Sequence, residues 1–168
     1  GTEGLLVVIS APSGAGKTSI LREVMHKRPE VRFSVSATTR GPRAGEVDGR
    51  EYHFVTNAEF DSLLARGEFV EWAVVHDERY GTLKREIAGA FDRGETIILD
   101  TDTVGARAIK SLYPGAVLIF IAPPSPAVLR ERLERRGTES PERVGRRLEA
   151  APLEMERAGE YDYIVVNE

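Results

Sequence analysis

The residues that most clearly indicate chemistry lie near the start of the chain, in residues 5–19, LLVVISAPSGAGKTS. The apolar run at its beginning predicts a strand buried on both faces. Small residues follow, and after them come Gly16-Lys17-Thr18 and an amphipathic segment that predicts a helix over Ser19–Lys27. A strand, a small-residue loop, Gly-Lys-Thr and a helix, in this order, are typical of a phosphate-binding P-loop.

A phosphate chain can lie against backbone N–H groups only where side chains are small, and a helix N-terminus adds positive partial charge. We expect Lys17 to reach the β/γ-phosphates of ATP and the Thr18 hydroxyl to ligate Mg²⁺. The P-loop pattern begins with Gly where this chain has Ala11, which we interpret as a tolerated variant because Ala fits a negative φ. The alternative, a glycine-rich turn without a ligand, is disfavoured by the Lys-Thr pair and by the flanking elements. The residues predicted to bind ATP are Ala11, Pro12, Ser13, Gly14, Ala15, Gly16, Lys17 and Thr18.

The composition is that of an ordinary globular protein. The chain has 168 residues, of which 41% are hydrophobic and 30% charged, which suits a single domain with a substantial core. The net charge of -4 gives no basic field for nucleic acid, and the absence of cysteine excludes disulfides and thiolate sites. The sequence has neither an apolar run approaching the ~20 residues of a membrane span nor a signal peptide. We therefore expect no membrane association and a cytoplasmic location.

A Gly/Pro-rich loop over residues 39–46 presents Arg40 and Arg43 after a segment, Arg32–Thr38, that predicts a strand. Two arginines in a loop can hold an anion through paired N–H groups. A solvated basic turn explains the same pattern, and these residues alone leave both interpretations open.

The segment Glu95–Asp100 is a second buried-strand pattern. Two acids, Asp100 and Asp102, lie at its carboxyl end and just after it. Asp100, at the carboxyl end of that strand, is placed like a Walker-B acid that helps to hold Mg²⁺. Either acid, and Asp102 above all, is alternatively the N-cap of a helix that begins near Thr103. The predicted metal ligands are Thr18 and Asp100.

The remaining patterns predict the elements that position these residues. Thr56 and Glu59 form a possible capping box for a helix that ends at Gly67. Further predictions are a strand over 68–75, a polar loop over 76–79, a helix that follows Tyr80-Gly81-Thr82 and ends near 93–94, a strand over 116–122 and a final strand over 161–167.

Residues 130–147 contain seven arginines and only four acids. Such an excess is often a solvated, salt-bridged face. It also suits a mobile helical lid whose arginines stabilise a transferring phosphoryl group. No general base is evident in the sequence, which favours phosphate over hydroxyl as the acceptor.

The assembled pattern predicts an α/β fold of the P-loop NTPase type, a three-layer α/β/α core around a parallel sheet. We expect one domain over residues 1–168, made of a core (1–34, 83–125, 148–168), an inserted small β-rich lobe (35–82) and an Arg-rich lid (126–147).

Several stretches together resemble guanylate kinases, the enzymes that convert GMP and ATP to GDP and ADP. These stretches are SAPSGAGKTS, SVSATTRGPRAGEVDGREYHFV, GEFVEWA, RYGT, ILDTD, IFIAPPS, LERRGTE and YIVVN, and they cover essentially the whole chain in order. Many NTPases share the P-loop, but the combination with TTRxPRxGExxGxxYxF and FxEWA is highly specific.

The resemblance implies that residues 35–82 bind GMP. Arg40 and Arg43 would hold its phosphate with Tyr52 and Tyr80, and Glu71 would accept hydrogen bonds from guanine N1 and N2. Ser36 and Thr82 would contact the O6/N7 edge, Asp102 would add an acceptor near guanine, and Asp100 would lie near Mg²⁺ and Lys17. The implied GMP-binding residues are Ser36, Arg40, Arg43, Tyr52, Glu71, Tyr80, Thr82, Asp100 and Asp102. The implied catalytic residues are Lys17, Arg40, Arg132, Arg136 and Arg147.

Two positions depart from the family pattern: Arg79 stands where an aromatic residue is usual, and Val104 where Gln is common. We therefore expect a kinase that transfers the γ-phosphoryl of ATP to GMP, as a monomer or homodimer. The alternatives are a non-catalytic guanylate-kinase-like protein-binding module and a P-loop kinase for another nucleoside monophosphate or a small hydroxylated metabolite.

Overall fold

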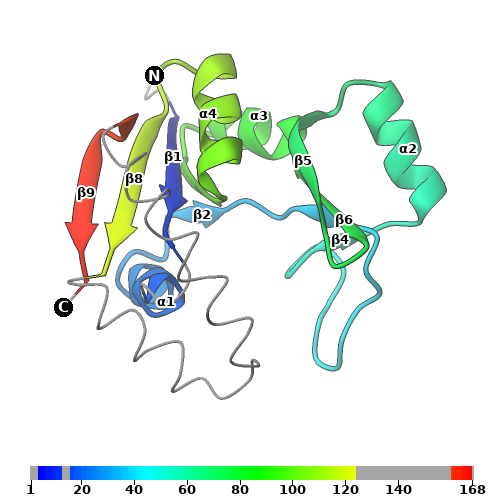
Figure 1. Ribbon diagram of the computed structural model, residues 1–168, viewed down its shortest axis with the longest axis horizontal. Helices are drawn as coiled ribbons and strands as arrows, with labels where there is room; N and C mark the ends of the chain where they lie inside the picture. Colours follow the sequence, from blue (N-terminus) through cyan, green and yellow to red (C-terminus); the bar gives the residue numbers. More distant parts are fainter. Residues whose placement is uncertain (1–3, 13–15, 124–159, 168) are drawn as a thin grey trace. The chain divides into compact units, whose positions relative to one another are not determined.

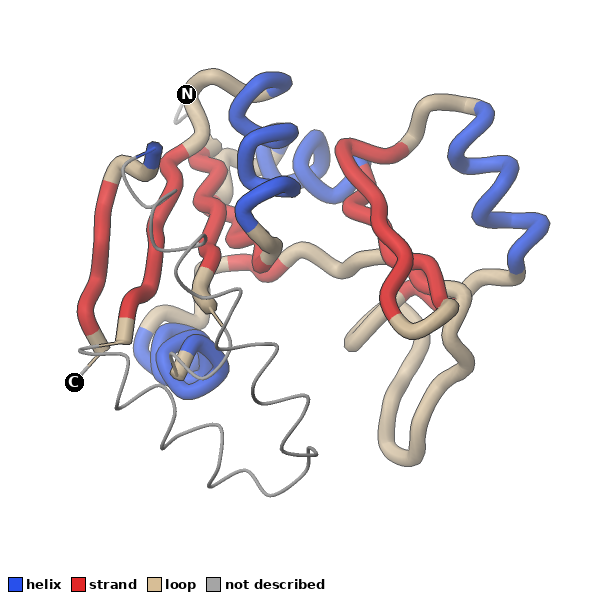
Figure 2. The backbone as a smooth tube through the Cα atoms, in the orientation of Figure 1, coloured by secondary structure: helices blue, strands red, loops and turns tan. Residues whose placement is uncertain are grey.

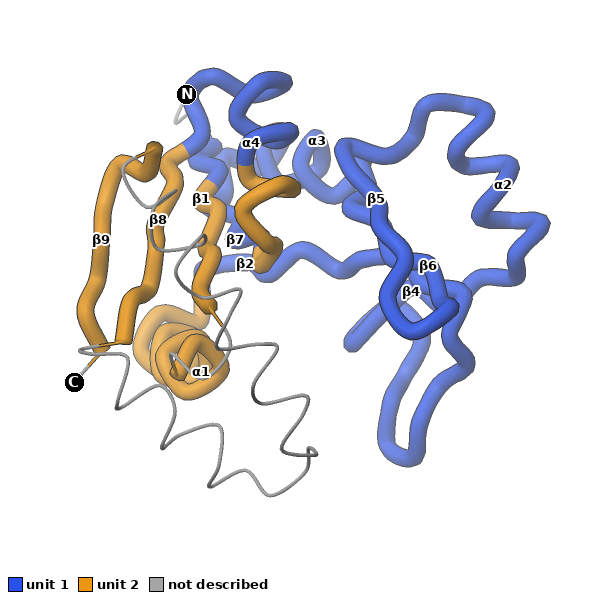
Figure 3. The backbone as a smooth tube through the Cα atoms, viewed as in Figure 1, with its two compact units in different colours: residues 1–6, 30–99, 107–116 blue, residues 7–29, 100–106, 117–168 orange. Residues whose placement is uncertain are grey.

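The computed structural model describes residues 4–12, 16–123 and 160–167. Its backbone forms two compact units, coloured separately in Figure 3. Unit 1 consists of Gly1–Leu6, Glu30–Leu99 and Arg107–Ala116, and unit 2 of Val7–Pro29, Asp100–Ala106 and Val117–Glu168. Strands and helices alternate along much of the chain, as Figure 1 shows, so the α/β fold is confirmed.

The first sheet has the strand order β2-β7-β1-β8-β9. The pairs β2–β7, β1–β8 and β8–β9 are all parallel. The cores of β1, β7 and β8 are apolar and buried, as their continuous apolar runs predict for a parallel sheet. These five strands are Leu5–Ser10 (β1), Arg32–Phe33 (β2), Thr96–Asp100 (β7), Val117–Ala122 (β8) and Tyr163–Val166 (β9).

The second sheet lies in unit 1 and has the order β4-β3-β6-β5. Its strands are Ala37–Thr38 (β3), His53–Phe54 (β4), Phe69–Val75 (β5) and Glu78–Leu83 (β6). β5 and β6 form an antiparallel hairpin through His76 and Asp77, which have φ of 50° and 64°. Positive φ at both turn residues is the conformation that suits the twist of a tight hairpin.

Two expectations about these strands were wrong. Arg32–Thr38 is not one strand, because its ends form β2 in the first sheet and β3 in the second. The polar loop predicted over residues 76–79 is shorter, because Glu78 and Arg79 already belong to β6. Tyr80-Gly81-Thr82 form the middle of this strand, paired on one side with β3 and on the other with β5, and the predicted helix follows from Lys84.

Figure 2 draws helices in blue. Four helices are described: Lys17–Lys27 (α1), Asn57–Ala65 (α2), Lys84–Asp92 (α3) and Thr103–Leu112 (α4). The capping box of α2 is confirmed, because Thr56 Oγ1 accepts from the Glu59 N–H and the Glu59 carboxylate accepts from the Thr56 N–H, both at 3.1 Å. Every helix in the described part of the chain is too short or too polar to cross a bilayer.

Two aromatic rings and a glycine hold the second sheet together. Phe60 of α2 packs on Phe69 of β5 with ring centroids 4.5 Å apart, and both side chains are buried. A Cβ added at Gly81 would lie 2.5 Å from two carbons of the Phe69 ring, so the ring fits only where that strand carries glycine. This packing stabilises β6, the strand that carries two residues of the predicted GMP site, Tyr80 and Thr82.

Candidate active site

The strand and the helix predicted to flank the P-loop are both present. β1 ends at Ser10, and α1 begins at Lys17 directly after Gly16. Gly16 has a φ of 85°, a left-handed conformation that glycine adopts without strain. Thr18 lies exposed in the first turn of α1. The predicted loop residues Ser13, Gly14 and Ala15 lie outside the described residues.

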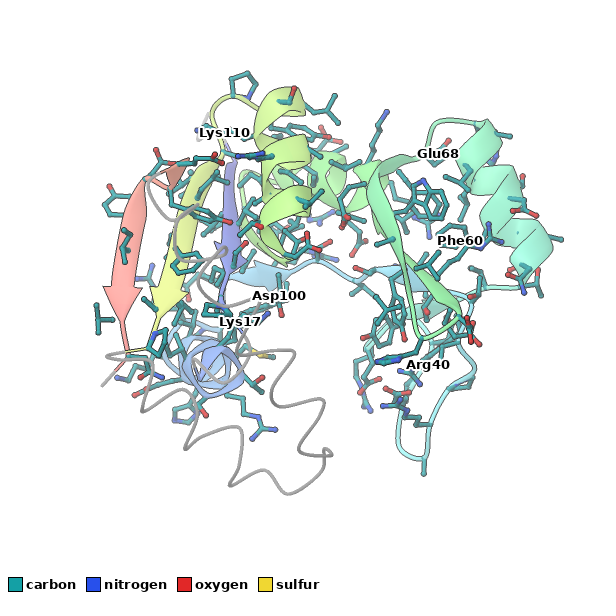
Figure 4. All side chains as sticks on the ribbon, in the orientation of Figure 1. Lys17, Arg40, Phe60, Glu68, Asp100 and Lys110 are labelled. Carbon is teal, nitrogen blue, oxygen red and sulfur yellow. The ribbon has the colours of Figure 1, made fainter. Side chains whose placement is uncertain are left out.

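Lys17 is ion-paired within unit 2. Its Nζ lies 2.6 Å from Oδ1 of Asp100, the last residue of β7, and Figure 4 labels both side chains. The Thr101 N–H donates to the Ile9 carbonyl at 3.1 Å, which holds the carboxyl ends of β1 and β7 together. The carboxylate therefore orients the lysine at the end of the sheet where the P-loop begins.

The donor set at this place fits Mg²⁺. The Thr18 hydroxyl and the partly exposed Asp100 carboxylate supply hard oxygen ligands, which Mg²⁺ prefers. In the described part of the chain no group of three or more His, Cys, Asp or Glu side chains could hold a metal. Mg²⁺ in nucleotide sites uses one or two protein oxygens, phosphates and waters, so this small donor set is sufficient.

Asp102 has a structural role of its own. Its Oδ1 accepts from the Gly105 N–H at 2.7 Å, and its carbonyl accepts from the Ser10 hydroxyl at 3.4 Å. The first contact caps the N-terminus of α4, as the alternative interpretation of this acid predicted. Its part in guanine recognition stays a prediction.

In unit 1, three residues of the predicted phosphate clamp lie together. The Tyr52 and Tyr80 rings meet edge to face at 5.8 Å, and Arg40 Cζ lies 5.1 Å from the centre of the Tyr52 ring. Arg43 is exposed, and its backbone N–H donates to the Glu46 carboxylate at 2.7 Å. The loop thus gathers one arginine with both tyrosines, while the second arginine extends from the same loop.

Glu46 is a residue of this site that the sequence prediction missed. Its two carboxylate oxygens accept from Arg40 Nη1 and Nη2 at 2.8 and 3.0 Å. The pKa of Glu46 is lowered from 4.5 to about 2. The hydrogen bonds from Arg40 are the largest cause, and the hydrogen bond from the Arg43 N–H is the next. The hydrogen bond to Glu46 is also the main reason that the pKa of the Arg40 guanidinium is raised, and Tyr80 adds to it. The only feature of the sequence that could have indicated this ion pair is an acid six residues after Arg40 in the same loop.

The predicted base-reading residues also meet. Glu71 of β5 pairs with Thr82 of β6, and the Thr82 hydroxyl donates to Glu71 Oε1 at 2.6 Å. Thr82 is buried and Glu71 is half-buried. Ser36, between β2 and β3, is half-buried, and its carbonyl accepts from the His53 N–H at 2.9 Å.

Arg79, the departure from the family pattern, contacts α2. Its guanidinium donates to Asp61 and to Asn57, and its Cζ lies 4.4 Å from the centre of the Phe60 ring. The side chain therefore packs and pairs with the helix next to β6. Arg132, Arg136 and Arg147 lie outside the described residues, so the lid remains a prediction.

A parallel sheet whose first strand leads into Gly-Lys-Thr and a helix, with the lysine paired to an acid at the end of a neighbouring strand, defines a P-loop nucleotide-binding protein. Comparison with known proteins narrows the class. The family model described as guanylate kinase matches residues 3–168.

Individual relatives agree with the family match. The guanylate kinase of Symbiobacterium thermophilum is 48% identical over 166 residues, which are 99% of this chain and 79% of that protein. The guanylate kinase of Thermotoga maritima is 49% identical, over 99% of this chain and 80% of that protein. The crystal structure of guanylate kinase from Anaplasma phagocytophilum matches with a TM-score of 0.71 and 32% identity, covering 100% of this chain and 79% of that one. The chain belongs to the guanylate kinase family.

Proposed function

We propose that the chain catalyses transfer of the γ-phosphoryl group of ATP to GMP, giving ADP and GDP. The observation that carries the proposal is β6, which brings Tyr80 to the phosphate clamp and Thr82 to Glu71 within one strand. One strand thus supports a group for the phosphate end and a group for the base end of a nucleotide.

The Glu71 carboxylate supports guanine as the base. Guanine presents two N–H donors side by side, at N1 and at the exocyclic N2, and a carboxylate offers two acceptor oxygens. Adenine has no donor at N1, so it could not make both of these hydrogen bonds to the Glu71 carboxylate, and a missing hydrogen bond to a charged group lowers affinity.

The Arg40 cluster supports a phosphate next to that base. The Arg40 guanidinium lies over the Tyr52 ring, which in turn contacts the Tyr80 ring, so this cluster offers charged N–H donors and phenol hydroxyls to phosphate oxygens. Arg43 adds a second cation from the same loop.

The P-loop supplies the other substrate site. Lys17 and the N-terminus of α1 would hold the β/γ-phosphates of ATP, and Thr18 with Asp100 would hold Mg²⁺, which neutralises charge on those phosphates. An oxygen of the GMP phosphate attacks the γ-phosphorus, and the bond from that phosphorus to the β–γ bridging oxygen breaks. We include in the proposal that Arg132, Arg136 and Arg147 stabilise the transferring phosphoryl group. This part rests only on their positions in the sequence.

The reaction needs positioning and charge neutralisation rather than a general base, because the acceptor oxygen of GMP is already anionic. We also include in the proposal a cytoplasmic location and a monomeric or homodimeric state.

The experiment is ADP release from ATP and Mg²⁺ with GMP, AMP, UMP and CMP supplied in separate reactions. The proposal expects release with GMP well above that with the other three. Release with another nucleotide would keep the kinase and reject the role of Glu71. Silence with all four from folded protein would favour the non-catalytic binding module.

A further inference from the structure

Glu46 closes the loop that carries both clamp arginines. Its Oε1 accepts from Arg40 Nη1 at 2.8 Å and from the Arg43 N–H at 2.7 Å, and its Oε2 accepts from Arg40 Nη2 at 3.0 Å. One carboxylate therefore fixes the side chain of the first arginine and the backbone of the second.

The hydrogen bonds of Arg40 show which N–H groups of its guanidinium already have an acceptor. A guanidinium has five N–H donors. Nη1 donates to Glu46 and to the Gly41 carbonyl at 2.9 Å, and Nη2 donates once to Glu46. The Nε–H and the second Nη2–H lie along the other edge, and the Tyr80 side chain is a further hydrogen-bond partner of the guanidinium. Two parallel donors along one edge match two oxygens of a phosphate.

The surroundings hold that edge in place. The Arg40 and Glu46 side chains are only 13% and 18% exposed. Arg40 Cζ lies 5.1 Å from the Tyr52 ring centre and 5.8 Å from that of Phe54, so aromatic rings restrict the guanidinium while Glu46 fixes its rotation. Because the ion pair is mostly shielded from water, it is less weakened by solvent than an exposed pair.

We propose that Glu46 is a positioning residue for GMP: it binds the end of the Arg40 guanidinium so that the Nε/Nη2 edge faces the phosphate. This inference rests on the proposed function and assigns a role to a residue that does not itself contact the substrate. A carboxylate beside an anion-binding arginine repels the anion, so its presence requires a compensating effect. The fixed orientation of Arg40 supplies that effect.

A competing explanation predicts the opposite effect of removing the Glu46 charge on GMP binding. If Glu46 merely occupied Arg40 as a substitute for phosphate, the nucleotide would have to displace it, and removing its charge would tighten GMP binding. If Glu46 positions Arg40, removing its charge weakens GMP binding, because the Gln amide in Glu46→Gln would turn an NH₂ group toward an N–H donor.

The test measures KM and kcat for GMP and for ATP in wild type and in Glu46→Gln, with Glu51→Gln as matched control. Glu51 is an acid of the same loop region that accepts from the Val47 N–H at 2.7 Å and from Arg50, and no contact to Arg40 is among its hydrogen bonds. We expect Glu46→Gln to raise KM for GMP by about tenfold or more, since small misplacements of binding groups have effects of this size. KM for ATP in this variant, and both constants in Glu51→Gln, should stay within about twofold of wild type.

A second arm tests whether Glu46 acts through Arg40. In an Arg40→Ala background, Glu46→Gln should change kcat/KM for GMP by less than about twofold, because the guanidinium that it positions is gone. Thermal unfolding followed by circular dichroism checks that each variant is folded, and Glu46→Asp, which keeps the charge but shortens the side chain, replaces Glu46→Gln if the latter fails to fold.

Unchanged or lowered KM for GMP in Glu46→Gln would overturn the inference, and so would an equal loss in the Arg40→Ala background or in Glu51→Gln. In each of these cases the wild type still phosphorylates GMP and the proposed function stands. A wild type that neither binds nor phosphorylates GMP would overturn both.

Discussion

The Thr82 hydroxyl has one hydrogen, and it donates that hydrogen to Glu71 Oε1 at 2.6 Å. Guanine O6 and N7 are acceptors, so Thr82 can donate to them only by giving up this bond. At the scale of single residues, Thr82 is therefore better placed to orient the Glu71 carboxylate than to contact guanine directly. Glu71 then presents its oxygens in a fixed direction at the edge of β5.

Thr82→Val should raise KM for GMP by about tenfold, because a hydrogen bond to a charged group contributes about 1.5–3 kcal/mol and its loss frees the carboxylate. Thr82→Ser keeps the hydroxyl and should stay close to wild type. Steady-state kinetics with GMP and with ATP measure both variants. An equal rise in KM for ATP, or an equal effect of the Ser variant, would contradict the orienting role.

Glu46 gives a dependence of stability on pH. Its pKa falls from 4.5 to about 2 on folding, so its contribution to the free energy of unfolding is present above about pH 4.5 and is lost as pH falls toward 2. Urea unfolding of wild type and Glu46→Gln should therefore show a constant difference above pH 5 and a shrinking one below pH 4.5. A difference that grows on acidification would contradict the ion pair.

Sequence reasoning placed Asp100 near Lys17, as the structure does, but missed the ion pair of the arginine loop. Arg40, Tyr52 and Tyr80 were expected together and lie together. The Glu46–Arg40 pair was not expected, because charged residues six apart in a loop meet only if the loop turns back. That turn depends on the backbone, including Gly45 at a φ of 84°, and side-chain types alone do not determine it.

At the scale of elements, β6 was the strand that sequence reasoning missed. Its middle residues, Tyr80-Gly81-Thr82, lack a continuous apolar run and contain glycine, which weakens a strand locally. The strand forms because β3 and β5 pair with it on both sides. Tertiary pairing therefore overrides local preference at the element that the site most depends on. Strands with long apolar runs, such as β1 and β8, were predicted well because burial on both faces is visible in the sequence.

Gly81→Ala should destabilise the protein by about 1–3 kcal/mol, because the added methyl overlaps the buried Phe69 ring. Equilibrium urea unfolding gives the value. Gly115→Ala is the matched control, since a Cβ there meets nothing within 4 Å and no positive φ is involved. We also expect Gly81→Ala to weaken GMP use, because Tyr80 and Thr82 flank the changed residue. Equal stability of the two variants would show that Phe69 can move aside.

For the whole molecule, most residues predicted to bind GMP belong to one unit and the residues predicted to bind ATP to the other, while Asp100 and Asp102, also predicted near GMP, belong to unit 2. Lys17, Thr18 and Asp100 belong to unit 2, whereas Arg40, Glu71, Tyr80 and Thr82 belong to unit 1. The division of the chain into core, lobe and lid remains a prediction. We therefore expect that changes at Lys17 or Thr18 damage ATP chemistry without damaging the GMP-binding residues of unit 1.

Lys17→Ala should lower kcat by about 10²-fold or more, because removal of one preorganised charge at the transferring group has effects of this order. GMP binding without ATP, measured by calorimetry, should stay within about threefold of wild type, a change of well under 1 kcal/mol. Loss of GMP binding in a folded Lys17→Ala variant would contradict the separation.

In the proposed reaction the γ-phosphoryl group of ATP goes to GMP and not to water or another nucleotide. The most direct measurement supplies ATP labelled in the γ-phosphate to a mixture of GMP and AMP at equal concentration and separates the products. We expect the label in the β-phosphate of GDP, and the loss of most of that product in Glu71→Gln. Label found only in inorganic phosphate, or in ADP formed from AMP, would contradict it.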